Sequence, residues 1–410
     1  MDLAGRFHEG SGELRAADVD RQRDRLAQET LRLTHGAHLL PARDRRHGAP
    51  PDVGEATGAP RAGRGGSVRR GGRCGHSHEA ACHDRAVSTG HDNAIRFAEI
   101  FERICDQVSH VIQGKREAVE LSVLSLIVGG HLLLEDVPGV GKTTLAKALA
   151  AAVGGHFGRV QFTPDLLPAD VLGTSVWNRQ TGEFEFRPGP IFANILLADE
   201  INRASPKTQS ALLEAMAEEQ VTADGTTRPL TAPFLVIATQ NPLEHHGTYP
   251  LPESQLDRFL MKLSIGYPSR ADEASILAND GAVHQLEQTR PVATPETITA
   301  MTAYSRDVHV APSLTAYLLD LASASRNHRN LGLGISPRAV LGLQRAMKVR
   351  AAALGRTFAT ADDLKALAPV TLHHRIVVRP EATVQGVTPE DVIDDLLRSV
   401  AVPATGEARS

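Results

Sequence analysis

The sequence predicts an α/β protein built on a parallel five-stranded sheet with helices on both faces (an αβα sandwich), followed by an all-helical unit. Three observations support this prediction. Short apolar runs typical of buried strands alternate with helical segments between residues 131 and 265, a pattern that favours parallel strands. A Gly-rich loop separates the first of these strands from the next helix. After Pro268 the strand pattern fades, and helical periodicity continues to about residue 368.

The strands are predicted where apolar residues run without interruption, as in strands buried on both faces. The predicted segments are His131–Glu135, Arg159–Phe162, Ile195–Ala198, Phe234–Ala238 and Met261–Ile265. An amphipathic helix is expected before the first strand, with apolar spacing that begins at Ala94. A second helix, Thr143–Val153, follows the Gly-rich loop. A third begins at Pro206 and runs to Ala217, because Ser205 is a favourable N-cap and Pro fits the first helical turn.

Two insertions in the α/β part have the pattern of β-hairpins. Gly173–Phe192 contains Trp177, Phe184 and Phe186 around a Thr181-Gly182 turn. Gln220–Leu230 contains Asp224-Gly225, a dipeptide favoured in tight hairpin turns. On the residues alone, surface hairpins without a special role are as well supported as functional ones.

The first ninety or so residues differ from the rest of the chain. They are rich in Gly, Ala, Arg and His, and no Lys precedes Lys115. Such a segment buries too little apolar surface to offset the entropy lost on ordering. We therefore expect a disordered extension at 1–92, an α/β core at 93–270 and a helical unit at 271–403.

A cluster of Cys and His lies in this extension: Cys74, His76, His78, Cys82 and His83. Thiolates and imidazoles this close together are able to ligate zinc. The spacing matches no familiar zinc finger, and the surroundings are of low complexity. A His-rich tail, or an upstream region translated from an early start codon, is the simpler interpretation, and metal binding stays open.

The composition limits the functional classes. The chain has 44 Lys and Arg against 48 Asp and Glu, a formal net charge of −4, which argues against nucleic-acid binding through bulk positive charge. The N-terminus lacks the apolar stretch of a signal peptide. The longest apolar run, Leu121–Leu134, is too short for membrane insertion. Three Cys make no disulfide framework. We therefore expect a soluble cytoplasmic protein.

The Gly-rich loop has the residues of a phosphate-binding loop (P-loop). Glycines let backbone N–H groups turn toward a phosphate, and the helix N-terminus adds its positive end. Lys142 is able to reach the β- and γ-phosphates of a nucleotide, and the Thr143 hydroxyl is able to bind Mg²⁺. The strict motif has Gly where this chain has Asp136, which we expect to add negative charge close to the phosphates. The predicted nucleotide-binding residues are Pro138, Gly139, Val140, Gly141, Lys142, Thr143 and Thr144.

Polar residues follow two of the predicted strands. Asp199 and Glu200 come directly after Ile195–Ala198, and the carboxyl ends of parallel strands face the ligand crevice. We expect Asp199 to hold Mg²⁺ through water and Glu200 to polarise the attacking water, as a Walker B pair. Asn241 follows Phe234–Ala238, where an amide is able to orient the same water, although Asn before Pro is also common in turns.

Two arginines are candidates for phosphate contacts. Arg258 stands in the segment QLDRF, although a lone Arg is normally a surface charge. Arg338 follows Ser336-Pro337 at the start of a predicted helix. A positive charge there opposes the helix dipole at a cost of about 0.3–1 kcal/mol, which a nearby phosphate would offset.

Together these residues resemble the MoxR family of AAA+ ATPases, over roughly residues 93–403. Nothing before Asn93 resembles the family. Several of the matching segments are long and distinctive. They are Glu135–Thr143, Phe186–Ala204 (FRPGPIFANILLADEINRA), Pro206–Glu214, Ile237–Pro242, Gly247–Met261 (GTYPLPESQLDRFLM) and Ser336–Ala339. The resemblance implies an AAA+ P-loop NTPase core with a C-terminal helical lid domain.

The resemblance also implies roles for single residues. Asn241 corresponds to the first sensor and Arg338 to the second, in the lid. Arg258 is similar to the arginine finger, which reaches the γ-phosphate on the neighbouring subunit, so a ring, usually a hexamer, is implied. Gly114 is similar to the family's adenine-side segment. The two hairpins resemble the helix-2 and pre-sensor-1 inserts, which in related ATPases face the ring pore or a bound partner.

The implied function is hydrolysis of Mg·ATP that drives chaperone-like remodelling or maturation of a separate protein, often one with a von Willebrand A domain. Three alternatives stay open. An ATPase subunit of a metal chelatase has a similar fold and similar inserts. A non-hydrolysing nucleotide switch or scaffold is disfavoured by the complete set of site residues. A DNA-acting AAA+ protein is disfavoured because no clear basic patch follows Asn93, and residues 1–92 hold 15 Arg against 13 acidic residues.

Overall fold

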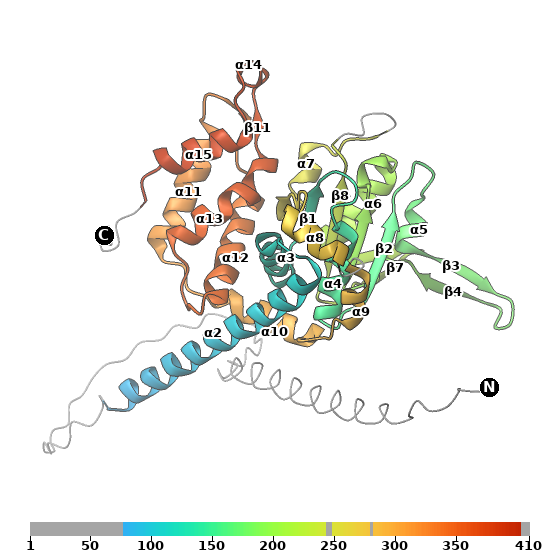
Figure 1. Ribbon diagram of the computed structural model, residues 1–410, viewed down its shortest axis with the longest axis horizontal. Helices are drawn as coiled ribbons and strands as arrows, with labels where there is room; N and C mark the ends of the chain where they lie inside the picture. The colour runs from blue at the N-terminus through green and yellow to red at the C-terminus, as the bar shows by residue number, and fades with distance from the viewer. Residues whose placement is uncertain (1–76, 243–247, 279–281, 403–410) are drawn as a thin grey trace, which may run out of the picture.

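The computed structural model describes residues 77–242, 248–278 and 282–402. A twisted parallel sheet with helices on both faces forms one part of the molecule, and the C-terminal helices gather beside it (Figure 1). A long two-stranded hairpin projects from the side of the sheet opposite these helices (Figure 1). The predicted α/β core and helical lid are therefore confirmed, while their exact boundaries stay predictions.

The sheet contains five parallel strands in the spatial order β2-β5-β8-β1-β9. All five predicted strands are present, with ends shifted by a residue or two. Their bounds are β1 (Leu132–Glu135), β2 (Phe157–Gln161), β5 (Ile195–Asp199), β8 (Leu235–Gln240) and β9 (Met261–Leu263).

Alternate residues of these strands enter two separate cores, as the two-residue period of a strand requires. Leu132 and Leu134 pack with the helices on one face, whereas Leu133 packs with those on the other. The first face is covered by α2 (Ser77–Val111), α3 (Arg116–Val128) and α4 (Lys142–Ala152). The second is covered by α5 (Pro168–Leu172) and α6 (Pro206–Glu218). Burial on both faces explains the uninterrupted apolar runs.

Helix α2 begins earlier than predicted, at Ser77 rather than near Asn93. No Pro interrupts residues 77–92, so the helix continues through this segment although Gly90 is unfavourable in it. The disordered extension expected at 1–92 stays a prediction, and residues 1–76 lie outside the described part. Of the proposed zinc cluster, Cys74 and His76 lie outside it too, as do the side chains of the other three members.

Both predicted hairpins are present. Strand β3 (Gly173–Asn178) pairs with β4 (Glu183–Pro188), and β6 (Gln220–Ala223) pairs with β7 (Thr226–Pro229), each antiparallel. The two hairpins touch: the Ser175 N–H donates to the Asp224 carboxylate at 3.2 Å, and the Arg228 guanidinium lies 3.7 Å from the centre of the Phe186 ring. The β6–β7 hairpin follows α6 almost directly, whereas the β3–β4 hairpin lies between α5 and β5 in the chain.

Short elements complete the α/β part. A 3₁₀ turn, η1 (Ile201–Arg203), links β5 to α6, and α7 (Glu253–Leu256) precedes β9. Ser205 caps α6 as predicted, since its hydroxyl accepts the Thr208 N–H at 3.4 Å.

The C-terminal part is helical, as predicted, with one addition. Its elements are α8 (Arg270–Ala278), α9 (Ala282–Gln288), α10 (Pro295–Arg306), α11 (Pro312–Arg326), α12 (Pro337–Ala353), α13 (Ala361–Leu372), η2 (His373–Arg375), α14 (Pro380–Val384) and α15 (Pro389–Ser399). The addition is a small antiparallel pair, β10 (Leu331–Leu333) with β11 (Val377–Val378).

Apolar residues of α10–α13 share one core with α2, α3 and α4, so α2 and α3 connect the lid to the sheet. No helix in the described ranges has the length and apolar character needed to span a membrane.

His131 is a buried imidazole that joins three elements just before β1. Its Nδ1 accepts the Val236 N–H at 3.1 Å, and its Nε2 donates to the Met216 carbonyl at 3.0 Å. Burial lowers the pKa of His131 to about 4, and the hydrogen bond to Met216 opposes this shift. The imidazole is therefore neutral in the folded protein at pH 7.

We expect this histidine to make the protein less stable in mild acid. The unfolded chain binds a proton near pH 6.5 and the folded chain only near pH 4. The unfolded state therefore holds more protons between these values, and the free energy of unfolding falls as pH is lowered through this window. The expected contribution from pH 7 to pH 5 is about 2 kcal/mol. Urea unfolding at both pH values measures the loss, and His131→Gln should reduce it by that amount. An equal loss in both proteins would contradict the prediction.

Candidate nucleotide-binding site

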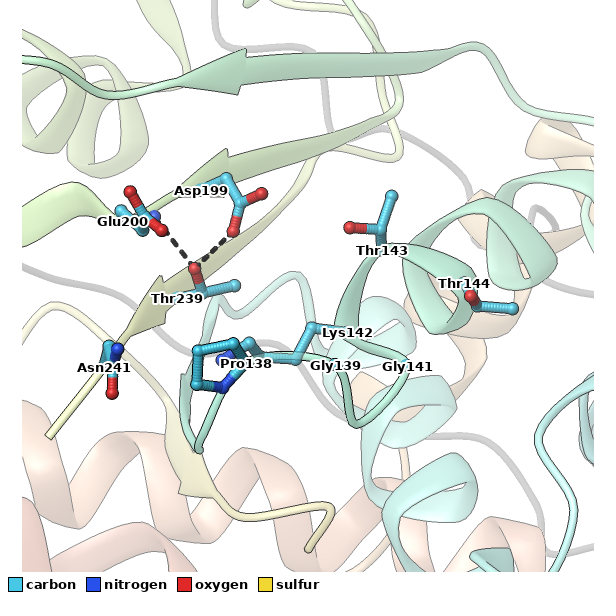
Figure 2. Close-up of a pocket in the computed structure, with 10 residues that line it drawn as sticks. All are labelled: Pro138, Gly139, Gly141, Lys142, Thr143, Thr144, Asp199, Glu200, Thr239 and Asn241. Carbon is cyan, nitrogen blue, oxygen red and sulfur yellow. Dashed lines mark hydrogen bonds between the residues drawn. The ribbon is translucent and has the colours of Figure 1, made fainter. Parts of the chain in front are cut away.

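A cavity of about 310 Å³ lies at the carboxyl edge of the sheet, where β1, β5 and β8 end (Figure 2). The P-loop and the start of α4 form one wall, and the ends of β5 and β8 form the other. Its lining residues are Pro138, Gly139, Gly141, Lys142, Thr143, Thr144, Asp199, Glu200, Thr239 and Asn241. Nine of these ten were predicted from the sequence, and the structure brings them to one place.

The P-loop depends on glycine for its conformation. Gly139 and Gly141 have φ of 87° and 96°, in the left-handed region that other residues rarely adopt. Gly141 is the N-cap of α4, so the loop leads directly into the helix N-terminus. The Lys142 ammonium donates to the carbonyls of Asp136 at 2.7 Å and Val137 at 3.3 Å. This cation is therefore held over the loop, beside the cavity.

The expectation that Asp136 adds negative charge to the phosphate site is wrong. The Asp136 side chain is buried and is directed toward the end of β9 instead. Its carboxylate accepts hydrogen bonds from the Ser264 hydroxyl at 2.7 Å and from the N–H groups of Ile265 at 2.6 Å and Gly266 at 3.0 Å. Three donors satisfy this carboxylate, so Asp136 fastens the start of the P-loop to the segment that leads into α8.

Asp199 and Glu200 share a partner that the sequence analysis missed. The Thr239 hydroxyl donates to Asp199 Oδ1 at 2.7 Å and accepts the Glu200 N–H at 2.9 Å (Figure 2). Asp199 Oδ2 also pairs with Arg159 at 2.8 Å. Thr239 is buried at the end of β8, next to Asp199 in the sheet. The sequence signal for Thr239 was its position as a polar residue directly after the predicted apolar strand Phe234–Ala238.

Glu200 adopts an uncommon backbone conformation, with a φ of 57°. Non-Gly residues in this region cluster at functional sites, since the strain needs support from surrounding structure. The Glu200 carboxylate accepts a hydrogen bond from Gln161 at 2.8 Å and forms an ion pair with Arg203 at 2.9 Å. Neither partner was predicted. Gln161 stands at the end of β2, on the same sheet edge.

The site has the donor atoms that Mg²⁺ prefers. The Thr143 hydroxyl and the Asp199 carboxylate are oxygen donors on opposite sides of the cavity (Figure 2). Within the described residues no group of three or more His, Cys, Asp and Glu is arranged to hold a metal ion. Because Mg²⁺ retains several waters and is often bound by one carboxylate plus substrate phosphates, this sparse donor set fits it.

Two predicted ligands do not line the cavity. Val140 packs against the apolar core. Gly114 lies in the turn between α2 and α3 with a φ of 71°, and a Cβ at this position would come within 2.1 Å of the Asp272 carboxylate on α8. Gly114 is therefore required for this close approach, and it does not line the cavity.

The two predicted arginines line a second cavity, of about 210 Å³. It lies between α6, the loop after α7 and the N-terminal part of α12. Its charged lining residues are Arg258, Arg338, Arg345, Arg375, Asp257 and Glu219. Arg258 also donates to the Leu213 carbonyl in α6. The structure thus brings Arg258 and Arg338 together, but separately from the P-loop and the acidic pair.

Arg375 is a buried cation at this second cavity that sequence reasoning missed. Burial lowers the pKa of Arg375 to about 10, with Asp257 opposing the shift and Arg338 adding to it. Its Nη2 donates to the Phe259 carbonyl at 2.5 Å, whereas Nε and Nη1 are buried without a hydrogen-bond partner. With four arginines against two acids, the cavity favours an anion.

Comparison with known proteins agrees with this geometry. Residues 131–261 match the family described as ATPase family associated with various cellular activities (AAA), and residues 323–396 match the AAA lid domain. The chain is 47% identical over 303 residues to protein YeaC of Bacillus subtilis, covering 74% of this chain and 95% of YeaC. It is 39% identical over 351 residues to chaperone MoxR1 of Mycobacterium tuberculosis, and the match covers 83% of this chain and 91% of MoxR1.

The chain belongs to the MoxR family of AAA+ ATPases. A crystal structure from Cytophaga hutchinsonii, named as a candidate ATPase, has a TM-score of 0.73 and 35% identity, and the match covers 78% of this chain and 99% of that one. The resemblance that the motifs indicated is confirmed.

Restoring the missing glycine of this MoxR P-loop should harm the protein. Asp136→Gly removes the acceptor for three hydrogen bonds and leaves buried N–H groups unpaired, so we expect the free energy of unfolding to fall by about 2–4 kcal/mol. ATP affinity should not improve. Urea unfolding and binding of a fluorescent ATP analogue measure the two effects. Glu135→Gly is the control, since it adds similar backbone freedom one residue earlier and removes only a partly exposed ion pair with Lys262, so it should cost about 1–2 kcal/mol. Tighter ATP binding with unchanged stability would contradict this account.

Proposed function

We propose that this MoxR-family protein hydrolyses Mg·ATP at sites shared between neighbouring subunits of a ring, and that hydrolysis drives remodelling of a protein partner. One observation supports this most strongly. Lys142, Thr143, Asp199, Glu200 and Asn241 converge on one cavity, whereas Arg258 and Arg338 converge on another with no lining residue in common. Two subunits placed side by side would join the two halves.

In the P-loop cavity, the chain's own groups would bind and orient the triphosphate. The backbone N–H groups of residues 139–144 and the Lys142 ammonium would contact its phosphates. Lys142 would first have to release the carbonyls of Asp136 and Val137, to which it now donates. Mg²⁺, held by Thr143 and Asp199, would neutralise charge on the β- and γ-phosphates. Gly114 would lie on the adenine side.

Glu200 would accept a proton from the attacking water, and Asn241 would orient that water. Gln161 and Arg203 contact the Glu200 carboxylate. A carboxylate that releases these partners is a stronger hydrogen-bond acceptor for water. The left-handed backbone at Glu200, supported by Thr239, would fix the direction from which the base acts.

Arg258 and Arg338 would act on the nucleotide of the neighbouring subunit. Charge spreads over the γ-phosphate oxygens in the transition state, and an arginine finger can contribute a factor of about 10³–10⁵ in rate. The excess of arginine at the second cavity suits a triphosphate. A closed ring gives each subunit one neighbour on either side, and we propose a hexamer, acting in the cytoplasm.

The hairpin of β3 and β4 is the part we propose for contact with the partner. Trp177 and Phe184 form an edge-to-face pair with ring centres 5.1 Å apart, and they are 51% and 70% exposed. Exposed aromatic groups often mark contact sites for other proteins. The relative named chaperone MoxR1 supports a chaperone-like role, and we propose a separate von Willebrand A domain protein as the partner.

Glu200→Gln tests the proposed base. The amide keeps the size of the side chain but cannot accept a proton, so ATP turnover should fall by about 10²–10⁴-fold while ATP affinity changes little. Steady-state phosphate release and equilibrium binding of ATP measure the two quantities. Turnover within a few-fold of the unmodified protein would remove Glu200 from this role.

Mixing two inactive variants tests the shared site. Arg258→Ala subunits keep an intact P-loop cavity, and Lys142→Ala subunits keep intact arginines, so neighbouring copies can together form a complete site. Turnover in the mixture should exceed the sum for the two variants alone. Arg398→Ala, which removes an exposed arginine from α15, is the control and should retain full turnover. Failure to recover turnover at every mixing ratio would contradict an arginine supplied by the neighbour.

A further inference from the structure

Arg258 stands between two residues that are both fastened to the lid. On its N-terminal side, Asp257 Oδ1 accepts a hydrogen bond from the Ser336 hydroxyl at 2.9 Å. On its C-terminal side, the Phe259 carbonyl accepts hydrogen bonds from His374 Nε2 at 3.0 Å and from Arg375 at 2.5 Å. The loop that carries Arg258 is thus held on both sides by the lid.

Through Ser336, Asp257 is connected to the N-terminal end of helix α12. Ser336 is the N-cap of α12, and its hydroxyl accepts the Ala339 N–H at 3.0 Å while donating to Asp257. Arg338 lies in the first turn of this same helix. One carboxylate oxygen therefore joins the loop of Arg258 to the helix end that carries Arg338.

The charge of Asp257 has a second effect on the cavity. The same oxygen lies 3.7 Å from Nε of Arg375, whose side chain is only 2% exposed. Gly342 leaves room for this guanidinium, since a Cβ there would lie 3.3 Å from its Nη1. Arg258, Arg338 and Arg375 would repel one another without a nearby anion. Asp257 supplies a negative charge next to the most buried of the three.

We propose that Asp257 is a positioning residue. It holds the loop with Arg258 and the N-terminal end of α12 with Arg338 in a fixed relative position, so that both arginines contact the same phosphate of the neighbouring subunit. This inference rests on the shared site proposed above. Asp257 acts on the two arginines through its contacts with Ser336 and Arg375. Because Ser336 and Arg375 both belong to the lid, a movement of the lid in one subunit would move the arginine that acts on the next.

The expected consequence is a loss of turnover without a loss of binding. Displacement of a catalytic group by about 1 Å can cost 10²-fold in rate. In Asp257→Ala we expect kcat to fall by about 10–100-fold, with ATP affinity at the P-loop cavity within about twofold of the unmodified protein. Asp257→Asn keeps an acceptor for Ser336 but lacks the charge facing Arg375, so its loss should be intermediate. Glu253→Ala, an exposed carboxylate on α7, is the matched control with unchanged turnover.

Mixing with Lys142→Ala subunits separates positioning from general damage. Such subunits supply well-placed arginines to the intact P-loop cavities of Asp257→Ala subunits, so turnover should recover. Ring assembly, measured by native mass spectrometry, should be the same for the variant and the unmodified protein. If Asp257→Ala does not fold, the same measurements on Asp257→Asn decide the question.

Two results would overturn the inference: kcat of Asp257→Ala within twofold of the unmodified protein, or a loss that mixing does not restore although mixing restores Arg258→Ala. Failure of the Arg258→Ala mixture itself would instead reject the shared site, so the two proposals can fail separately.

Discussion

The parallel pairing of β1, β5 and β8 is the constraint on which the candidate site depends. Parallel strands in register end at the same edge, so the P-loop after β1, the acids at the end of β5 and the polar residues at the end of β8 meet without long loops. The Thr239 hydroxyl links the ends of β8 and β5 directly, because it forms hydrogen bonds with the Asp199 carboxylate and the Glu200 N–H. The apolar runs that bury the strands therefore also place the reactive groups.

The arginines are positioned by the lid rather than by the strand ends, because they lie in the lid or on a segment that contacts it. Arg258 precedes β9 by only a few residues, yet its neighbours are bonded to α12 and η2. Arg338, Arg345 and Arg375 all belong to the lid itself. Four arginines thus line the cavity where the lid meets the sheet, whereas Asp199 and Glu200 stand at the other cavity, at the end of β5.

Local patterns predicted the five strands of the sheet, both hairpins and nine of the ten residues around the P-loop cavity, because strand ends, glycine turns and helix caps are encoded by neighbouring residues. Contacts between distant segments could not be predicted in this way. Asp136 looked like a charge beside phosphates, and only the position of Ser264 and the following N–H groups shows where its carboxylate lies. Gln161 and Arg375 carried no local signal, since their roles depend on Glu200 and Asp257, far along the chain. The helix that contains Ala94 starts earlier than its apolar spacing indicated, at Ser77, because a change in composition need not end a helix.

Helix α6 connects the Glu200 turn, Arg258 and the β6–β7 hairpin. It begins beside the turn that carries Glu200 and Arg203, it accepts a hydrogen bond from Arg258 at Leu213, and it leads into the hairpin of β6 and β7. That hairpin is tied in turn to the projecting β3–β4 hairpin through Asp224 and the Arg228–Phe186 contact. A helix of 13 residues is a stiff rod about 20 Å long. A load applied at the exposed tip therefore has a short path through α6 to Glu200, the proposed base of one site, and to Arg258, the arginine proposed to complete another.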